Sequence, residues 1–377
     1  MDLDLDENTR AFQAEVRKFL EANAESIPTK SYDNAEGFAQ HRHWDRVLFD
    51  AGLSVITWPE KYGGRDAPLL HWVVFEEEYF RAGAPGRASA NGTSMLAPTL
   101  FAHGTEEQRN RILPKMASGE QIWAQAWSEP ESGSDLASLR STATKTEGGW
   151  LLNGQKIWSS RAPFAEMGFG LFRSDPAAER HNGLTYLMFD LKADGVTVRP
   201  IVQLSGDTGF GEIFLDDVFV PHEDVIGTPN DGWRAAMSTS SNERGMSLRS
   251  PARFVAAAER LVRMWKDRGS PEAFADSVAD AWIKAQAYRL QTFGTVTRLA
   301  AGGELGAESS VTKVFWSDLD VAIHQTALDL LGADGELAGA WTEGLLFALG
   351  GPIYAGTNEI QRNIISERLL GLPREKK

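Results

Sequence analysis

The spacing of apolar residues changes twice along this chain of 377 residues. Up to about residue 120 they recur every three or four positions, as in RAFQAEVRKFLEANA, which predicts amphipathic helices. They then form short runs such as LTYLMFDL, separated by Gly, Asp and Pro, which predict strands, and from about residue 230 the helical spacing returns. We therefore expect an α+β protein with an N-terminal helical domain (1–120), a central small β-barrel or sandwich domain (121–227) and a C-terminal four-helix bundle (228–377).

Two short signals predict where elements begin or turn. Thr105 and Gln108 have the spacing of a helix capping box, and the residues between them are acidic. Apolar residues flank Asn153-Gly154 in GWLLNGQKIWSS, and Asn-Gly between two apolar runs is typical of a type I′ hairpin. We expect a helix to begin after Thr105 and a tight turn at Asn153-Gly154.

Composition and charge exclude several classes of function. The chain has no cysteine, which excludes disulfides, thiolate nucleophiles and thiolate metal ligands. Its formal net charge of −14 argues against nucleic acid as a partner, although local backbone donors and single basic residues can still hold a phosphorylated ligand. The seven histidines are scattered, so we expect no metal site. The acidic start MDLDLDENTR and the lack of a long apolar run predict a cytoplasmic protein without a membrane span.

Four sequence words occur in an informative order. They are WSEPESGSDLASL (127–139), LNGQKIWSS (152–160), IFLDDVFVP (213–221) and YAGTNEIQRNII (354–365). Together with the helix–strand–helix order, they give the chain a resemblance to the acyl-CoA dehydrogenase family along essentially its whole length. The resemblance implies FAD as the cofactor, an acyl-CoA substrate and an electron-transfer flavoprotein as the electron acceptor.

The residues in these words suit a flavin, whose flat ring is mostly apolar and is edged with hydrogen-bonding atoms. Trp158 can cover the ring, Ser128 and Ser160 can bond to its edge, and Gly133-Ser134 allows close backbone approach. Taken alone, a strand Trp is more often core and Ser-Gly-Ser-Asp is more often a plain turn. Within the family words the flavin interpretation is favoured, and the resemblance adds further cofactor contacts at Gln125, Trp127, Thr357 and Glu359.

The catalytic base is not where many family members have it. Dehydrogenation removes a weakly acidic α proton, which requires a carboxylate beside it and a polarised thioester oxygen. The usual glutamate position is Ala355, whose backbone N–H can still polarise the thioester carbonyl. Glu243-Arg244 in STSSNERGMSL matches members whose base lies on the first helix after the β domain, so we expect Glu243 to be the base rather than a solvated helix residue. The substrate contacts implied by the resemblance are Ser134, Arg244, Tyr354 and Gly356.

Two segments depart from the family pattern. KDRGSPEAFADSVAD lacks the Arg-x-x-Phe-Gly segment that reaches the FAD of a neighbouring subunit. ALDLLGADGEL has Asp329, Gly332, Ala333 and Gly335 where many members have Gln followed by Gly-Gly-x-Gly. The chain is therefore expected either to form a homotetramer with other FAD contacts or to form a heterotetramer with a sister subunit, as in members that process steroid-derived CoA esters.

Three functions remain in competition. The leading one is an acyl-CoA dehydrogenase of fatty acid or steroid catabolism that forms a trans-2-enoyl-CoA. The others are an oxygen-using flavoenzyme of the same fold, such as an acyl-CoA oxidase or monooxygenase, and a partner subunit of a heteromeric dehydrogenase. The presence of Glu243 favours the first, because a monooxygenase needs no base for an α proton and a non-catalytic subunit needs no base at all.

Overall fold

The computed structural model describes residues 3–244, 250–303 and 305–374, and for 241–244 the backbone only. The chain forms two compact units, each built from separated segments. The bundle unit comprises Met1–Ala24, Pro68–Ala84 and Arg244–Lys377, and the sheet unit comprises Glu25–Ala67 and Pro85–Glu243. Both contain elements of the first 120 residues, and the predicted three-domain boundaries remain a prediction.

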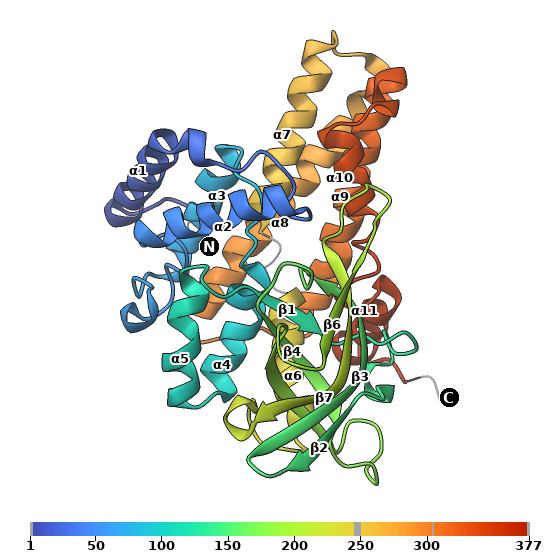
Figure 1. Ribbon diagram of the computed structural model, residues 1–377. Helices are drawn as coiled ribbons and strands as arrows, with labels where there is room; N and C mark the ends of the chain where they lie inside the picture. Colours follow the sequence, from blue (N-terminus) through green and yellow to red (C-terminus); the bar gives the residue numbers. More distant parts are fainter. Residues whose placement is uncertain (1–2, 245–249, 304, 375–377) are drawn as a thin grey trace. The chain divides into compact units, whose positions relative to one another are not determined.

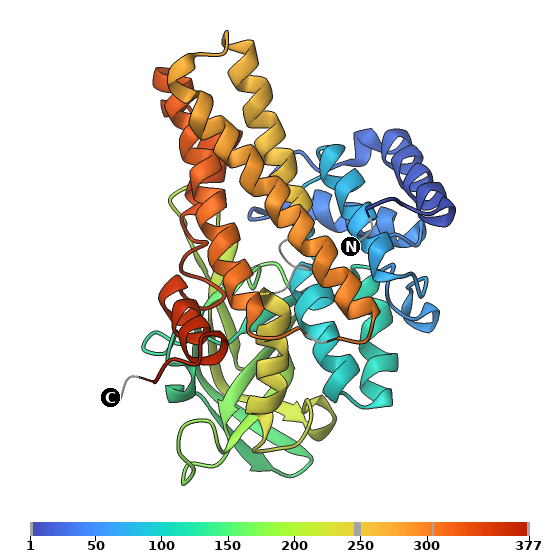
Figure 2. The same ribbon diagram turned by 180° about the vertical axis from the view of Figure 1, so that it is seen from behind.

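The bundle unit is helical (Figures 1 and 2). Helices α7, α8 and α9 lie side by side, and their shared core includes Phe254, Leu261, Tyr288, Trp316 and Ile323. The elements of this unit are α1 (Glu7–Ala22), α3 (Leu69–Arg81), α7 (Pro251–Asp267), η6 (Glu272–Phe274), α8 (Ala275–Ala300), α9 (Glu308–Leu331), η7 (Gly332–Glu336), α10 (Ala340–Ala348), α11 (Asn358–Ile364) and η8 (Ile365–Leu369).

Helix α3 joins the bundle through specific contacts. Val73 packs against Phe293 and Val296 of α8, and Glu77 forms an ion pair with Arg289 at 2.5 Å. Helix α1 in turn packs on α3, where its Arg17 forms an ion pair with Glu78 at 2.9 Å. These long-range contacts explain why α1 and α3 belong to the same unit as helices that follow much later in the sequence.

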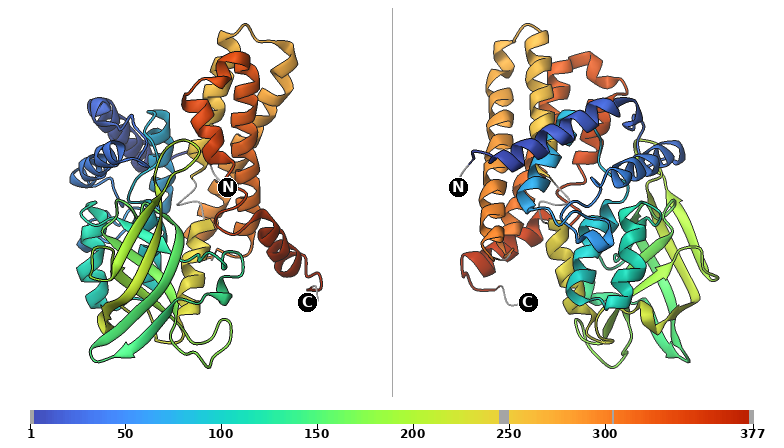
Figure 3. Two further views of the ribbon diagram at one scale, coloured as in Figure 1. Left: turned by 45° about the vertical axis from the view of Figure 1, so that its right-hand side comes forward. Right: turned by 90° about the vertical axis from the view of Figure 1, so that its left-hand side faces the viewer.

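The sheet unit combines a seven-stranded sheet of the described residues with helices (Figure 1). The strand order is β1-β4-β2-β3-β7-β6, and β5, which lies off this path, pairs antiparallel with β4 along its whole length. The sheet curls strongly (Figure 3), and its core includes Trp150, Phe172, Phe189, Ile213 and Val218. The strands are β1 (Trp123–Ala126), β2 (Thr142–Thr146), β3 (Gly149–Ser160), β4 (Met167–Arg173), β5 (Leu184–Asp190), β6 (Val196–Ile201) and β7 (Phe210–Pro221).

Helical elements before and after the strands complete this unit. The π-helical turn η3 contacts both β1 and α5. The elements are α2 (Ala35–Asp50), η2 (Glu60–Tyr62), η3 (Asn91–Leu96), α4 (Ala97–His103), α5 (Glu106–Ala117), η4 (Leu136–Ser138), η5 (His222–Asp224) and α6 (Gly232–Arg244), while η1 (Ala24–Ser26) lies where the chain passes between units. The α+β prediction, with a helical start, a central sheet and a helical end, is confirmed.

The capping-box prediction is confirmed. The hydroxyl of Thr105 accepts from the N–H of Gln108 at 3.1 Å, and the Gln108 side chain accepts from the N–H of Thr105 at 3.0 Å. The side-chain amide of Gln108 also donates to the carbonyls of Glu223 and Val225, both at 2.7 Å. One residue therefore caps α5 and holds the segment that leads into α6.

The predicted hairpin at Asn153-Gly154 is wrong. Strand β3 runs straight through these residues, and a bulge interrupts its pairing with β7 between Leu152 and Gly154. Gly154 is needed because its φ is +140° and a Cβ there would overlap the Ser141 side chain. Asn153 closes the bulge through reciprocal hydrogen bonds with Asp217 at 2.8 and 2.9 Å. The sequence signal was that of a bulge rather than a turn.

Within the described part of the chain, no helix has both the length and the apolar character needed to cross a bilayer.

Candidate active site

The predicted site residues fall into two groups. Gln125, Trp127, Ser128, Gly133, Ser134, Trp158 and Ser160 belong to the sheet unit, whereas Tyr354, Ala355, Gly356, Thr357 and Glu359 belong to the bundle unit. Glu243 and Arg244 end α6, where one unit gives way to the other. Their backbone is helical, and their predicted side-chain roles lie outside the described residues.

The side chain of Trp158 is exposed to solvent rather than buried. It lies near the end of β3, where the pairing with β7 is interrupted between Lys156 and Ser159, and its φ of +58° is unusual for a bulky residue. The indole is 58% exposed and contacts only the edge of Phe210 at 6.2 Å among the described aromatic pairs. The indole therefore offers a flat apolar surface on strained backbone, two residues before the half-buried Ser160.

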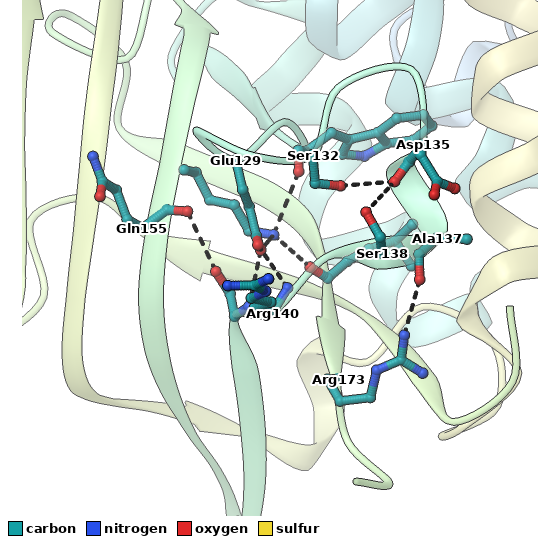
Figure 4. A network of polar contacts seen from close by, with 12 residues as sticks. Glu129, Ser132, Asp135, Ala137, Ser138, Arg140, Gln155 and Arg173 are labelled. Carbon is teal, nitrogen blue, oxygen red and sulfur yellow. Dashed lines mark hydrogen bonds and ion pairs between the residues drawn. The ribbon is translucent and has the colours of Figure 1, made fainter. Parts of the chain in front are cut away.

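A buried ion pair joins Glu129, which is labelled in Figure 4, to Lys156, which lies two residues before Trp158 in β3. The ammonium of Lys156, which is fully buried, donates to Oε1 of Glu129 at 2.8 Å and to the carbonyl of Leu171 at 2.8 Å. The other acceptors of Glu129 are filled by the N–H groups of Arg140 at 2.6 Å and Ser141 at 2.9 Å. Glu129 is therefore a structural carboxylate with all its strong contacts directed inward.

The pKa directions agree with a charged pair. Burial on its own raises the pKa of Glu129, but the charge and hydrogen bond of Lys156, together with the hydrogen bonds from Arg140 and Ser141, lower the pKa overall. Burial lowers the pKa of Lys156, and Glu129 opposes that shift. A buried pair of this kind is strongly destabilising to break on one side only.

The ion pair joins two of the sequence words. Glu129 lies in the WSEP segment and Lys156 lies two residues before Trp158 in the QKIW segment. Next to the pair, the carbonyl of Ser128 accepts from the N–H of Ile157 at 2.9 Å. Ser128 and Trp158 are thus held in a fixed relation by one backbone bond and one buried salt bridge.

A second polar chain leads from the same loop to α6. The indole N–H of Trp127 donates to the hydroxyl of Tyr186 at 3.2 Å, and that hydroxyl contacts Thr239 at 3.2 Å. Thr239 is fully buried on α6 and also contacts the hydroxyl of Thr99 at 2.7 Å. Position 243 follows position 239 by one helical turn. The contacts of Thr239 therefore fix the position of the helix that carries Glu243 relative to the loop that carries Trp127.

In the bundle unit, the residues before α11 form a strained turn. Ala355 and Gly356 have φ values of +57° and +77°. The buried amide of Gln361 donates to the carbonyls of both residues, at 3.0 and 3.2 Å. Among the described backbone hydrogen bonds, the N–H of Ala355 has no acceptor. The turn therefore holds its carbonyls inward and leaves this N–H available as a donor.

The beginning of α11 is fixed by its first residues. Thr357 caps the helix by accepting from the N–H of Ile360 at 3.3 Å. Oδ1 of Asn358 accepts from the buried ammonium of Lys313 at 2.8 Å and from the hydroxyl of Ser317 at 3.1 Å. Glu359 is exposed, and hydrogen bonds from its own backbone N–H and from Thr357 lower its pKa.

The remaining predicted residues differ in their setting. Gly133 and Ser134 lie on an exposed loop, and a Cβ on Gly133 would meet nothing within 4 Å. Gln125 is half-buried in β1, and its side-chain nitrogen is buried without a hydrogen-bond partner in the described structure. Such a donor is able to bond to an acceptor that a ligand brings.

Sequence reasoning missed the residues that support the site. Lys156 stood in a quoted word without a role, and Gln361 was not assigned at all. For Lys156 a signal existed, because a lysine at an inward position of a strand core needs a carboxylate partner. Among the described residues, no group of three His, Asp or Glu side chains could hold a metal ion.

Three family models match the chain in sequence order. The N-terminal domain of acyl-CoA dehydrogenases matches residues 6–120, the middle domain matches 124–218 and the C-terminal domain matches 230–370.

Individual relatives agree with these matches. The acyl-CoA dehydrogenase IpdE1 of Mycobacterium tuberculosis is 38% identical over 387 residues, covering 98% of this chain and all of the relative. The solved Tcur3481-Tcur3483 steroid ACAD is 26% identical, with a TM-score of 0.87 and full coverage of both chains. The ChsE4-ChsE5 complex from Mycobacterium tuberculosis is also 26% identical, with a TM-score of 0.84 and full coverage of both chains.

Proposed function

This chain belongs to the acyl-CoA dehydrogenase family, and from that premise we propose that it oxidises an acyl-CoA thioester to the trans-2-enoyl-CoA. The observation that carries the proposal is the exposed Trp158 on left-handed backbone, in a strand that is joined to the Ser128 loop by the Ile157–Ser128 hydrogen bond and the Lys156–Glu129 pair. A surface of this shape and polarity suits the flat ring of a flavin.

The residues of the sheet unit fit FAD. Trp158 offers an apolar face, Ser128 and Ser160 offer hydroxyls near its edge, and Gln125 offers a buried nitrogen donor with no described partner. When bound, FAD would accept the hydride that leaves the β carbon. Gly133, Ser134 and Trp127 in the sheet unit, and Thr357 and Glu359 in the bundle unit, are proposed as further cofactor contacts.

The protein's own part in the reaction is proton transfer and charge stabilisation. The carboxylate of Glu243 takes the α proton, and the electron pair left on the α carbon forms the new C=C bond as the β hydrogen leaves with its own pair. The N–H of Ala355 donates to the thioester carbonyl, where negative charge develops. Ser134, Arg244, Tyr354 and Gly356 are proposed to contact the substrate.

We further propose a bulky, ring-bearing acyl group and assembly with a chain of the same fold. Support comes from the match to a structure described as a steroid ACAD and from the two-chain complexes among the solved relatives. The altered GADG segment at η7 and the missing Arg-x-x-Phe-Gly segment are consistent with a sister chain that completes the FAD site. An electron-transfer flavoprotein is the proposed electron acceptor.

Anaerobic titration tests the proposal. The purified protein, alone and with a co-expressed sister chain, should be yellow and should lose its absorbance near ~450 nm on addition of a suitable acyl-CoA. Linear, branched and ring-bearing acyl-CoAs should be compared. Admitting air to the reduced protein then separates a dehydrogenase, which reoxidises slowly, from an oxidase. Absence of bleaching with every acyl-CoA would contradict the proposed reaction.

A further inference from the structure

Arg161 is an unusual residue at the end of the flavin wall. It follows Ser160 directly, it is only 8% exposed, and its φ of +65° places a long side chain on left-handed backbone. Its N–H donates to the carbonyl of Gly209 at 2.5 Å, which holds the backbone in this conformation. Strained backbone at a non-glycine residue persists where the surrounding structure enforces it, and such residues cluster at functional sites.

The guanidinium is buried without a carboxylate partner. Its Nη1 donates to Oδ1 of Asn91 at 3.0 Å, and its Cζ lies 4.4 Å above the ring of Tyr32. Nε is buried and has no hydrogen-bond partner in the described structure. Asp33 and Asp45 interact with the charge electrostatically, yet among the ion pairs of the described residues neither reaches Arg161.

A purely structural buried arginine would normally be neutralised or have its donors filled. Desolvating a charged group is costly, and each donor left without an acceptor adds to that cost. The charge of Arg161 is only partly compensated, by Asp33 and Asp45 without an ion pair, while its Nε lacks an acceptor and its backbone conformation is unfavourable. An acceptor that arrives with a ligand would remove the first two, because a guanidinium bonds strongly to carbonyl and carboxylate oxygens.

The contacts of Asn91 locate the free donors. The Asn91 side chain accepts from Arg161 and donates to the carbonyl of Ser160 at 3.4 Å, so the guanidinium lies beside Ser160. Asn91 begins the π-helical turn η3, an element that is rare and frequently found at functional sites. The guanidinium, with its unpartnered Nε, therefore lies next to the wall that the proposed function assigns to the flavin and the reacting acyl chain.

We propose that Arg161 binds an oxygen function of the acyl group, such as a ring ketone, a hydroxyl or a carboxylate. This inference rests on the proposed function and makes it more specific, because it names the substrate class as oxygenated acyl-CoAs. Asn91 and Tyr32 position the guanidinium. A hydrocarbon acyl group of the same shape leaves the donors unfilled and binds less tightly.

The test compares matched substrates that differ only in oxygen. The first pair is 3-cyclohexylpropanoyl-CoA and 3-(4-oxocyclohexyl)propanoyl-CoA, and the second pair is heptanoyl-CoA and pimeloyl-CoA. We expect kcat/KM to favour at least one oxygenated member by about 10- to 100-fold, mostly through KM, since that is the value of a hydrogen bond to a charged group. Arg161→Met should reduce this ratio to about one, chiefly by lowering kcat/KM for the oxygenated member of the pair.

Arg180→Met is the matched control. Arg180 also has left-handed backbone, with a φ of +53°, but its side chain is 57% exposed and pairs with Asp135 on the surface. It should keep the wild-type preference. Equal loss with both members of each pair in Arg161→Met, or a lowered FAD affinity that accounts for the loss, would assign the guanidinium to folding or to the cofactor and overturn the proposal.

Binding without turnover keeps the inference separate from the proposed function. The change in the flavin spectrum, or in melting temperature, on adding each acyl-CoA measures preference even if no oxidation occurs. A wild-type protein that binds oxygenated and hydrocarbon members equally overturns the role of Arg161, whatever the variants do. A preference in binding without any flavin reduction supports the role of Arg161 and contradicts the dehydrogenase proposal.

Discussion

Glu243 is the residue on which the proposed chemistry depends, because Ala355 occupies the position where many family members have their base. Glu243→Gln replaces a proton acceptor with a near-isosteric amide. We expect fold and flavin spectrum to remain, and the anaerobic rate of flavin reduction to fall by about 10²- to 10⁴-fold. Rapid-mixing absorbance measures that rate. Glu147→Gln, at an exposed position of the β2–β3 turn, is the control and should react normally.

A complementary variant locates the base more narrowly. Ala355→Glu should add no activity, because a second carboxylate near the same carbon repels the first and raises at least one pKa. If Glu243→Gln kept a near-normal rate with the best substrate, Glu243 would be a surface residue. The base would then have to come from elsewhere in the chain or from a partner.

Variants of the Lys156–Glu129 pair can separate its effect on the position of the proposed FAD contacts from its effect on the free energy of unfolding. Lys156→Met alone leaves the Glu129 charge buried without its partner, and we expect a loss of about 3–5 kcal/mol in the free energy of unfolding. The neutral double variant Lys156→Met/Glu129→Gln should recover much of that loss. Its FAD affinity should nevertheless remain well below wild type, because the salt bridge that joins the Ser128 loop to the strand of Trp158 is gone.

Urea unfolding and FAD titration by fluorescence measure the two quantities on the same variants. The Arg253–Asp320 pair of the bundle unit, with a distance of 2.7 Å and a fully buried Asp320, serves as the control for removing a buried charge. Wild-type FAD affinity in the neutral double variant would show that the pair stabilises the sheet without positioning the cofactor wall.

At the scale of single residues, the sequence predicted the proposed flavin wall but not the residues that support it. Trp158 and Ser128 stand in recognisable words, so their sequence position was informative. The exposure of Trp158 was not predictable, because it depends on a break in the β3–β7 register that no local signal reports. Arg161 and Gln361 were missed for a related reason, since what distinguishes them is which atoms lack or share partners in the folded chain.

At the scale of helices and strands, a sequence signal predicted the structure correctly where the residues that form the hydrogen bonds are close in sequence. The Thr105–Gln108 capping box uses atoms three residues apart and was predicted correctly. Asn153-Gly154 failed because the same two residues suit a turn or a bulge, and the choice is made by Ser141 and Asp217 on neighbouring strands. Turn residues predict unusual backbone more reliably than they predict chain reversal.

Helix α2 carries two buried groups whose titrations oppose one another. Burial raises the pKa of Asp45 to about 6, and burial lowers the pKa of His41 to about 4. Between pH 6 and 4, folded Asp45 takes up a proton more readily than the unfolded chain, so its contribution to stability rises on acidification. Folded His41 resists protonation that the unfolded chain accepts below about 6.5, so its contribution falls. Each effect amounts to about 3 kcal/mol, and the two nearly cancel.

Single variants should show the separate contributions of Asp45 and His41 to the pH dependence of the free energy of unfolding. Relative to wild type, Asp45→Asn should lose stability as the pH falls from 6.5 to 4.5, because only the destabilising effect of the buried His41 remains. His41→Gln should gain stability over the same range, because only the stabilising protonation of the buried Asp45 remains. Urea unfolding at the two pH values measures this difference, and subtraction of the wild-type values removes the other titrating groups. Parallel pH dependence in all three proteins would contradict the assigned shifts.

At the scale of the whole molecule, the two compact units are assembled from segments that the sequence presents in a different order. Helices α1 and α3 join the bundle, whereas α2, which lies between them, belongs to the sheet unit. The contacts responsible link residues about two hundred positions apart, as in Glu77 with Arg289. Helical periodicity reports that a face is buried, but it does not report against which partner.

Helix α8 has exposed apolar side chains of a kind that a monomeric protein would normally bury. Ile283 is 59% exposed, and Leu290 lies two turns further along the same face of the helix. Trp282 and, on α9, Val311 are also exposed. Exposed apolar residues gathered on two adjacent helices indicate a protein interface. A second chain of the same fold, either a copy or a sister chain, is the partner expected from the assembly proposed above.

Light scattering on the chromatographed protein should therefore give an assembly, expected to be a tetramer with two-fold symmetry, rather than the 41.4 kDa of one chain. Ile283→Asp/Leu290→Asp places charges on the α8 face and should shift the protein toward the single-chain mass with loss of FAD. Leu204→Asp is the control, because Leu204 is 88% exposed on the β6–β7 loop and should leave the mass unchanged. A wild-type single chain that retains one full equivalent of FAD would contradict the shared cofactor site, since every contact needed for FAD would then come from one chain.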